Sequence, residues 1–299
     1  MYKVLFVDDE DFIRDMLFEY FREQFEVVTV ENASAGLNVL SNGGFDLVVS
    51  DINMPGMKGP QFLAEVHRLY PTVKTALLTC LNIDEYITLA RENSISSIIP
   101  KTAPFNFNEI ELILQGLLSG EIFGISRFLR LEDGIISNKY CIKSSAESRD
   151  VREKIVTELE ERFKSSGDTR LILDEILSNA IYHAPAKEEG SEKYAQFTEV
   201  ELEPSEYIYA QVGYDSEKYA VSVLDMQGRL TRDVVLSKME RQITGAGVLD
   251  DSGRGLHMSR LFADRMVINI ERNKRTEVII MNYLSGKYRG YKPLYINEI

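Results

Sequence analysis

Residues 45–59 have the sequence FDLVVSDINMPGMKG, in which a short apolar run ends at an acidic residue and passes into a loop with proline and glycine. Such a run is typical of a strand buried in a parallel sheet. Residues 2–7, 73–78 and 95–99 form similar runs, and segments with helical periodicity separate them. The alternation predicts an α/β domain built on buried parallel strands.

Polar residues stand at or just beyond the ends of these runs: Asp8, Asp9, Asp51, Thr79 and Lys101. Ligands of an open α/β sheet bind outside the carboxyl ends of its strands, so three carboxylates are expected to converge in one crevice. Clustered carboxylates repel one another, and a divalent cation with oxygen ligands, here Mg²⁺, relieves that repulsion. The cation would attract a phosphoryl donor, with Asp51 as the nucleophile and Thr79 and Lys101 binding the transferred group. Taken singly, each acid could be an ordinary strand-end cap.

The segment from Met1 to about Gly120 resembles a response-regulator receiver domain, and residues 51–59 resemble the phosphoacceptor loop of that family. The resemblance implies a flavodoxin-like, five-stranded parallel, doubly wound fold that an upstream sensor histidine kinase phosphorylates on Asp51. It also implies that Mg²⁺ is bound directly by Asp9, Asp51 and the backbone carbonyl of Asn53, and through water by Asp8. Thr79 and Lys101 take the phosphate-sensing roles of the family.

Two positions depart from the receiver pattern. Thr102 follows Lys101 where the family usually has a proline after a cis bond, and a cis bond before Thr102 would cost about 2.5–4 kcal/mol. Ile98 replaces the aromatic switch residue that usually stands three positions before the lysine. We therefore expect the signal to leave this domain by an unconventional surface.

With 299 residues, the chain is long enough for a second domain of similar size. Its formal charge of −13 and its pI of about 4.9 argue against a nonspecific grip on nucleic acid. No run of about 18 apolar residues indicates a membrane span, and the chain enters a strand without a signal-peptide pattern, so a cytoplasmic location is expected. Cys80 and Cys141 lack the spacing of a zinc site or a disulfide framework.

Residues 121–144 are predicted to be an ordered connector, and residues 145–299 a second domain. Ser145 can cap a helix over residues 146–164, and a second helix begins near Asp168. Glu175, Asn179 and His183 are spaced by four on that second helix and so share one face. Burying them is costly unless they bind something, and a magnesium nucleotide would satisfy the carboxylate and the amide. A partly exposed polar edge remains an alternative, and His183 fits either a core position or a site rim.

Farther along the chain, residues 207–214 with 218–225 and residues 266–271 with 276–283 are predicted to be two strand pairs. Between the pairs, residues 229–252 show little hydrophobic pattern. Gly253 and Gly255 precede a helix, where glycines let backbone amides approach a phosphate.

Together, residues 145–283 resemble the Bergerat-fold ATP-binding domain of histidine kinases, gyrase-type ATPases and anti-sigma-factor kinases, an α+β sandwich. The resemblance implies one role for each of the following residues: general base (Glu175), magnesium ligand (Asn179), adenine-amino contact (Asp225), backbone turn (Gly228), phosphate loop (Gly253, Gly255) and a position near adenine (Thr276). Gln227 stands where that family has a glycine, and no glycine precedes Thr276. Nucleotide binding is thus favoured over turnover.

None of the three histidines, His67, His183 and His257, heads a dimerisation hairpin, which argues against a self-phosphorylating histidine kinase. The second domain is more similar to the anti-sigma-factor serine kinases, which bind a sigma factor or phosphorylate an antagonist protein. A possible serine-protein kinase under receiver control is the leading hypothesis. The alternatives are a partner-sequestering module with a degenerate ATP site and a receiver that is purely structural. A homodimer is compatible with either family.

Overall fold

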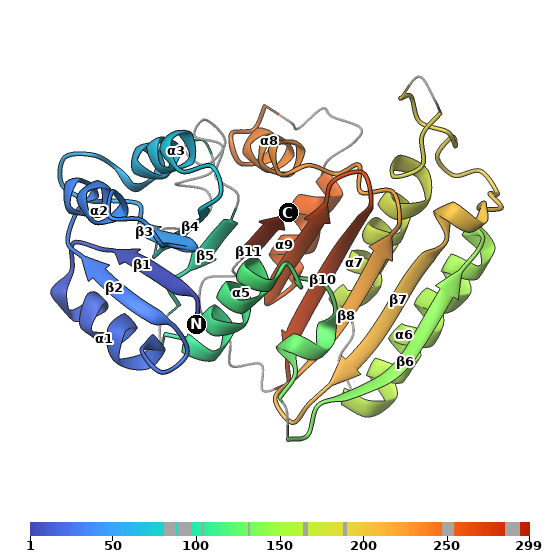
Figure 1. Ribbon diagram of the computed structural model, residues 1–299. Coiled ribbons are helices and arrows are strands. Elements are labelled where there is room, and N and C mark those ends of the chain that lie inside the picture. Colours follow the sequence, from blue (N-terminus) through green and yellow to red (C-terminus); the bar gives the residue numbers. More distant parts are fainter. Residues whose placement is uncertain are drawn as a thin grey trace. The chain divides into compact units, whose positions relative to one another are not determined.

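The computed structural model describes residues 1–80, 88, 97–102, 105–130, 132–163, 167–187, 190–246, 254–284 and 294–299. They form two compact units. The first contains Met1–Ile122 with Tyr295–Asn297, and the second contains Phe123–Leu294 with Glu298–Ile299. Figure 1 labels most of the helices and strands of both units.

The first unit is built on five parallel strands, as predicted, and their order in the sheet is β2-β1-β3-β4-β5. Their bounds are β1 (Lys3–Val7), β2 (Glu26–Val30), β3 (Leu47–Asp51), β4 (Lys74–Thr79) and β5 (Ser97–Pro100). Every residue of β3 is buried, which explains why its first three residues, Leu47, Val48 and Val49, are all apolar. The flavodoxin-like α/β architecture is confirmed.

Helices cover both faces of this sheet: α1 (Asp11–Phe21), α2 (Ala33–Leu40), α3 (Gly59–Leu69) and α5 (Phe107–Ser119). The ring of Tyr20 in α1 stacks on Phe107 in α5 with 4.6 Å between the ring centroids, so α1 and α5 share a face. Figure 1 shows α2 and α3 on the other face. As predicted, α5 ends at Gly120, whose φ of 78° suits a left-handed helix cap.

A sixth strand from the C-terminal end of the chain joins the first unit. Strand β11 (Leu294–Glu298) pairs antiparallel with β5, with Ile296 opposite Ile98. We had expected residues 145–299 to belong to one second domain, so this pairing is a difference from the sequence interpretation. Nothing in the five residues LYINE specifies the distant strand with which they pair.

The second unit contains a sheet in which all neighbouring strands are antiparallel, in the order β9-β10-β8-β7-β6. The strands are β6 (Ile135–Ile142), β7 (Ile208–Tyr214), β8 (Lys218–Asp225), β9 (Arg265–Glu271) and β10 (Arg275–Tyr283). Both predicted strand pairs are present within a residue of their expected ends. Strand β6 comes from the segment that we had interpreted as a connector.

Helices of the second unit are α6 (Ser145–Phe163), α7 (Gly167–Ser178), a π-helical turn η2 (Asn179–His183), α8 (Arg232–Ile243) and α9 (Arg254–Phe262), with 3₁₀ turns η1 (Ile125–Phe128) and η3 (Pro204–Glu206). Helices α6 and α7 lie on one face of the sheet (Figure 1). Ser144, rather than Ser145, is the cap of α6, because its hydroxyl accepts a hydrogen bond from the Glu147 amide at 3.1 Å. Helix α8 lies within residues 229–252, where the sequence shows little hydrophobic pattern. Among the described helices, none is long and apolar enough to cross a membrane.

Candidate functional site

Four of the predicted polar residues of the first unit lie at the carboxyl ends of its parallel strands. Asp8 follows β1, Asp51 ends β3, Thr79 ends β4 and Lys101 follows β5. The backbone amide of Lys101 donates to the carbonyl of Thr79 at 2.6 Å, which joins the last two ends. The sheet therefore gathers these side chains at one edge.

Lys101 binds two carboxylates at this edge. Its Nζ lies 2.6 Å from Asp8 Oδ2 and 2.7 Å from Asp51 Oδ1, and all three side chains are at least nine-tenths buried. Burial raises the pKa of Asp8, and the hydrogen bond and the charge of Lys101 oppose that rise. For Lys101, burial alone would lower the pKa, but the attraction of Asp51 and the bonds to both acids outweigh it and raise the pKa. One ammonium thus partly neutralises two buried carboxylates.

The loop after β3 orients Asp51. Its Oδ2 accepts a hydrogen bond from the Asn53 amide at 2.6 Å. A Cβ added to Gly59 would lie 1.8 Å from the Asp51 carbonyl oxygen, so the loop can close this tightly with glycine there. Asp9 and Asn53 are exposed beside this site. Within the described ranges, no three His, Cys, Asp or Glu side chains are grouped closely enough to form a metal site by themselves.

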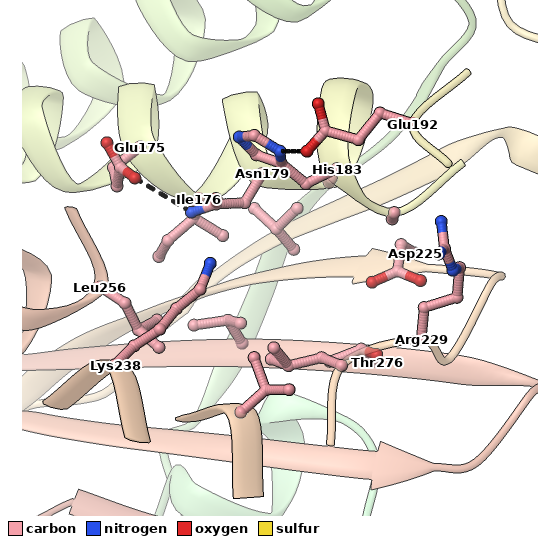
Figure 2. Close-up of a pocket in the computed structure, with 16 residues that line it drawn as sticks. Glu175, Ile176, Asn179, His183, Glu192, Asp225, Arg229, Lys238, Leu256 and Thr276 are labelled. Carbon is pink, nitrogen blue, oxygen red and sulfur yellow. Dashed lines mark hydrogen bonds and ion pairs between the residues drawn. The ribbon is translucent and has the colours of Figure 1, made fainter. Parts of the chain in front are cut away.

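The second unit contains a cavity of about 270 Å³ that brings together Glu175, Asn179, Asp225 and Thr276. Figure 2 shows Glu175 and Asn179 on the helix that forms one wall, and Asp225 and Thr276 on the facing strands. Glu175 belongs to α7, Asn179 to η2, Asp225 to β8 and Thr276 to β10. Thr276 is paired with Asp225 across the two strands.

Asp225 is held in position by the turn that follows it. The amides of Gln227 and Gly228 donate to its Oδ1 at 2.9 and 3.1 Å, so Oδ2 is the oxygen that can accept from a ligand. Burial raises the pKa of Asp225, against the effect of these two amides and of the nearby Thr276 hydroxyl. Gly228 has a φ of 58°, and a Cβ there would lie 2.4 Å from the Glu271 carbonyl oxygen. The turn therefore requires glycine at this position.

Thr276 presents a buried polar atom to the cavity. The residue is 2% exposed, and its hydroxyl oxygen has no hydrogen bond of good geometry within the described part of the chain, although it lies near enough to Asp225 to lower the pKa of that carboxyl. Leaving such a group unsatisfied costs about 1–3 kcal/mol. A ligand with a hydrogen-bonding edge in the cavity would remove that cost.

At the other end of the cavity, the amide of Asn179 donates to Glu175 Oε1 at 3.1 Å (Figure 2). A Cβ added to Gly255 would lie 1.5 Å from the carboxyl carbon of Glu175. Gly255 was predicted to let an amide approach phosphate, and here its missing side chain makes room for this carboxylate. Gly253 lies outside the described residues.

Comparisons with known proteins agree with the geometry of the first unit. Residues 4–115 match the family described as the response regulator receiver domain. The first unit is a receiver domain. Its sequence is 34% identical over 99 residues to the response regulator protein FleR of Pseudomonas aeruginosa, covering 32% of this chain and 21% of FleR. It is 32% identical over 123 residues to the probable transcriptional regulator ycf29 of Cyanophora paradoxa, covering 40% of this chain and 57% of ycf29.

Among solved structures, the receiver domain is similar to the response regulator protein TrrA from Thermotoga maritima in complex with Mg(2+)-BeF. That match has 32% sequence identity and a TM-score of 0.36, and it covers 40% of this chain and 100% of TrrA. This chain spans about a fifth to a half of the length of the first curated relatives that it matches.

Cationic residues of the cavity were missed in the sequence. Lys238 of α8 and Arg229 line it, and Figure 2 shows Lys238 extending between the helix wall and the strands. Arg229 donates to the Gly190 carbonyl at 2.7 Å. The sequence does contain a helix signal for α8. The Thr231 hydroxyl accepts a hydrogen bond from the Val234 amide at the start of the helix, and buried apolar residues follow at helical spacing. The polar residues that surround them obscured it.

His183 lies at the rim of this cavity rather than in the core. Its Nδ1 is 2.5 Å from Glu192 Oε1, and Gln196 Nε2 is 2.8 Å from its Nε2. Both His183 and Glu192 line the cavity. The imidazole thereby holds the Glu192 side chain at the rim of the cavity.

Proposed function

We propose that this chain is a two-component response regulator whose receiver domain is phosphorylated on Asp51 and whose second unit binds Mg–ATP. The second unit would then act on a protein partner, as anti-sigma-factor kinases do. The observation that carries the proposal is the cavity of the second unit, in which Glu175, Asn179, Asp225 and Thr276 meet although they are dispersed over a hundred residues of sequence.

In the receiver domain, the carboxylate of Asp51 would form a bond to phosphorus as the bond from phosphorus to the donor breaks. The donor is an upstream sensor histidine kinase. Mg²⁺ would be held directly by Asp9, Asp51 and the Asn53 carbonyl, and through water by Asp8. The ion prefers such oxygen donors, and the backbone carbonyl and water would supply the ligands that the three side chains do not provide by themselves. Lys101, which now bridges Asp8 and Asp51, would pair with the phosphoryl oxygens, and Thr79 would donate its hydroxyl to them.

In the second unit, Asp225 Oδ2 and the Thr276 hydroxyl would recognise the polar edge of adenine, since one is an acceptor and the other lacks a hydrogen bond of good geometry within the described residues. Asn179 would hold Mg²⁺, which neutralises charge on the phosphates. Lys238 adds a positive charge to the same cavity. Gln227 does not obstruct it, because its side chain donates to the Ser205 carbonyl at 2.8 Å.

Calorimetric titration with Mg–ATP tests nucleotide binding. We expect Asp225→Asn to weaken binding by about tenfold or more, because a hydrogen bond to a buried charged group is lost. Asp150→Asn is a matched control, since Asp150 is exposed on α6 and lies outside the cavity. Absence of heat with the unaltered chain, or equal Kd values for both variants, would contradict the proposed site.

Binding of the base should also depend on pH. Asp225 accepts hydrogen bonds best as a carboxylate, and burial raises its pKa. Lowering the pH towards the usual Asp pKa of about 3.9 should therefore weaken binding, and the loss should begin at a higher pH than an exposed Asp would require. Adenosine is the suitable ligand, because it lacks phosphates that titrate in this range. A nuclear magnetic resonance titration that gives the same Kd throughout would show that the charge of Asp225 is not used.

A non-catalytic function is the alternative, in which the second unit sequesters a partner under receiver control. It is favoured by Gln227 in place of a glycine and by the absence of a glycine immediately before Thr276. The net charge of −13 favours a protein partner, such as a sigma factor or its antagonist, over nucleic acid. A kinase would turn over the bound nucleotide, whereas a sequestering module would only bind it.

A further inference from the structure

Strand β10 has two functional faces. It lies between β8 and β9, and successive side chains of a strand point to opposite faces of the sheet. Thr276 and Val278 line the cavity, as does Asp225 on the neighbouring strand. Arg275 and Glu277 therefore lie on the opposite face, one residue to either side of Thr276.

The connector between the two units is attached to that opposite face. The Gly124 amide donates to Glu277 Oε2 at 2.8 Å, and the Arg275 guanidinium lies 4.0 Å from the centroid of the Phe123 ring. These two residues follow directly after Ile122, where the first unit ends. We call Phe123, Gly124, Arg275 and Glu277 the connector latch.

The latch is attached through a buried carboxylate. Glu277 is 3% exposed, and Oε2 also accepts from Asn269 Nδ2 at 3.2 Å. Burial raises the pKa of Glu277, against the effect of the Gly124 amide and its other donors. Burying a carboxylate without hydrogen-bond donors is destabilising, so the Gly124 amide stabilises Glu277 in this position.

The residues after Gly124 reinforce the attachment. Turn η1 packs on β7 and β8, and Ile125 is fully buried. In Figure 1 this green turn lies in front of the sheet, whereas α6 and α7 lie behind it. The connector thus covers the face of the sheet opposite to the cavity.

We propose that the connector latch couples the receiver domain to the nucleotide cavity, so that phosphorylation of Asp51 changes the affinity for ATP. This inference rests on the proposed nucleotide binding. Displacing the connector at Gly124 would shift Glu277, and the planar peptide bond passes that shift to Thr276. Thr276 and Asp225 are adjacent across β10 and β8, so the same shift alters the contacts expected for the base.

The test measures the Kd of a fluorescent, non-hydrolysable ATP analogue for the full chain, with and without beryllofluoride and Mg²⁺ as the phosphoryl mimic. We expect the mimic to change the Kd by about fivefold or more in the unaltered chain. Phe123→Ala and Glu277→Leu should bring the ratio of the two Kd values, with and without the mimic, to nearly one. Glu277→Gln keeps an acceptor for the Gly124 amide and should retain most of the change in Kd.

Two controls make the outcome specific. Asp51→Asn should remove the response to beryllofluoride, and Glu217→Leu should not, since Glu217 forms an exposed ion pair with Arg130 farther along the connector. Binding with a ratio of one in the unaltered chain overturns the latch but leaves the proposed function. A ratio that survives both Phe123→Ala and Glu277→Leu also overturns it. Absence of analogue binding by the unaltered chain overturns both.

Discussion

Asp51→Asn is expected to abolish incorporation of a phosphoryl group from acetyl phosphate into the full chain. Asp51 ends β3 with its Oδ1 2.7 Å from Lys101 Nζ and its Oδ2 bonded to the Asn53 amide. An amide in its place preserves the size of the side chain but is not a nucleophile, because its nitrogen lone pair is delocalised. We therefore expect complete loss of labelling rather than a partial decrease.

The measurement is the intact mass after incubation with acetyl phosphate and Mg²⁺, compared with the same sample without the metal. Asp15→Asn is the matched control, because it makes the same chemical change at an exposed position of α1. A mass increase that persists in Asp51→Asn would place the acceptor elsewhere. Loss of labelling in Asp15→Asn would indicate a general effect of the substitution on the receiver domain.

The phosphate site was largely predictable because local rules determine it. A buried parallel strand is a continuous apolar run, and its carboxyl end is where the sheet opens to a ligand. Asp8, Asp51, Thr79 and Lys101 could therefore be placed from short segments alone. That Lys101 bridges Asp8 and Asp51 depends on side-chain geometry, which spacing does not specify.

The features missed in the sequence depend on contacts between distant residues. Strand β11 pairs with β5 across about two hundred residues of sequence. The hydrogen bond from the Gly124 amide to Glu277 spans 153 residues, and neither residue type marks a pairing by itself. Lys238 could not be placed for a different reason: the apolar pattern of α8 is weak, and a single capping residue, Thr231, does not specify a helix by itself.

Glu175→Gln is expected to lower the release of ADP from Mg–ATP by about a hundredfold or more, the usual contribution of a general base. The amide retains an oxygen that can accept from Asn179 Nδ2, as Glu175 Oε1 does at 3.1 Å. The shape of this end of the cavity should therefore persist, and the Kd for Mg–ATP should change little. This combination separates a role in proton transfer from a role in binding.

The position of Glu175 favours this role. It borders the 270 Å³ cavity on one side and a second hollow of about 610 Å³ on the other, and Asn179 and His183 border both. A hydroxyl group that approaches through the second hollow would meet the Glu175 carboxylate beside Asn179, the residue proposed to hold Mg²⁺ on the phosphates. The carboxylate would then take the proton of that hydroxyl, or of water, as the oxygen bonds to phosphorus.

Glu161→Gln is the control for this substitution, because Glu161 is exposed on α6 and borders neither hollow. Equal ADP release by the unaltered chain and Glu175→Gln, with equal Kd values, would exclude Glu175 as the base. Tight binding of ATP without ADP release by the unaltered chain would favour the sequestering module, with the nucleotide serving to order the cavity. Gly255 leaves room for the Glu175 carboxylate, so Gly255→Ala should displace that carboxylate and lower ADP release, as Glu175→Gln does. This variant tests the position of the Glu175 carboxylate independently of its charge.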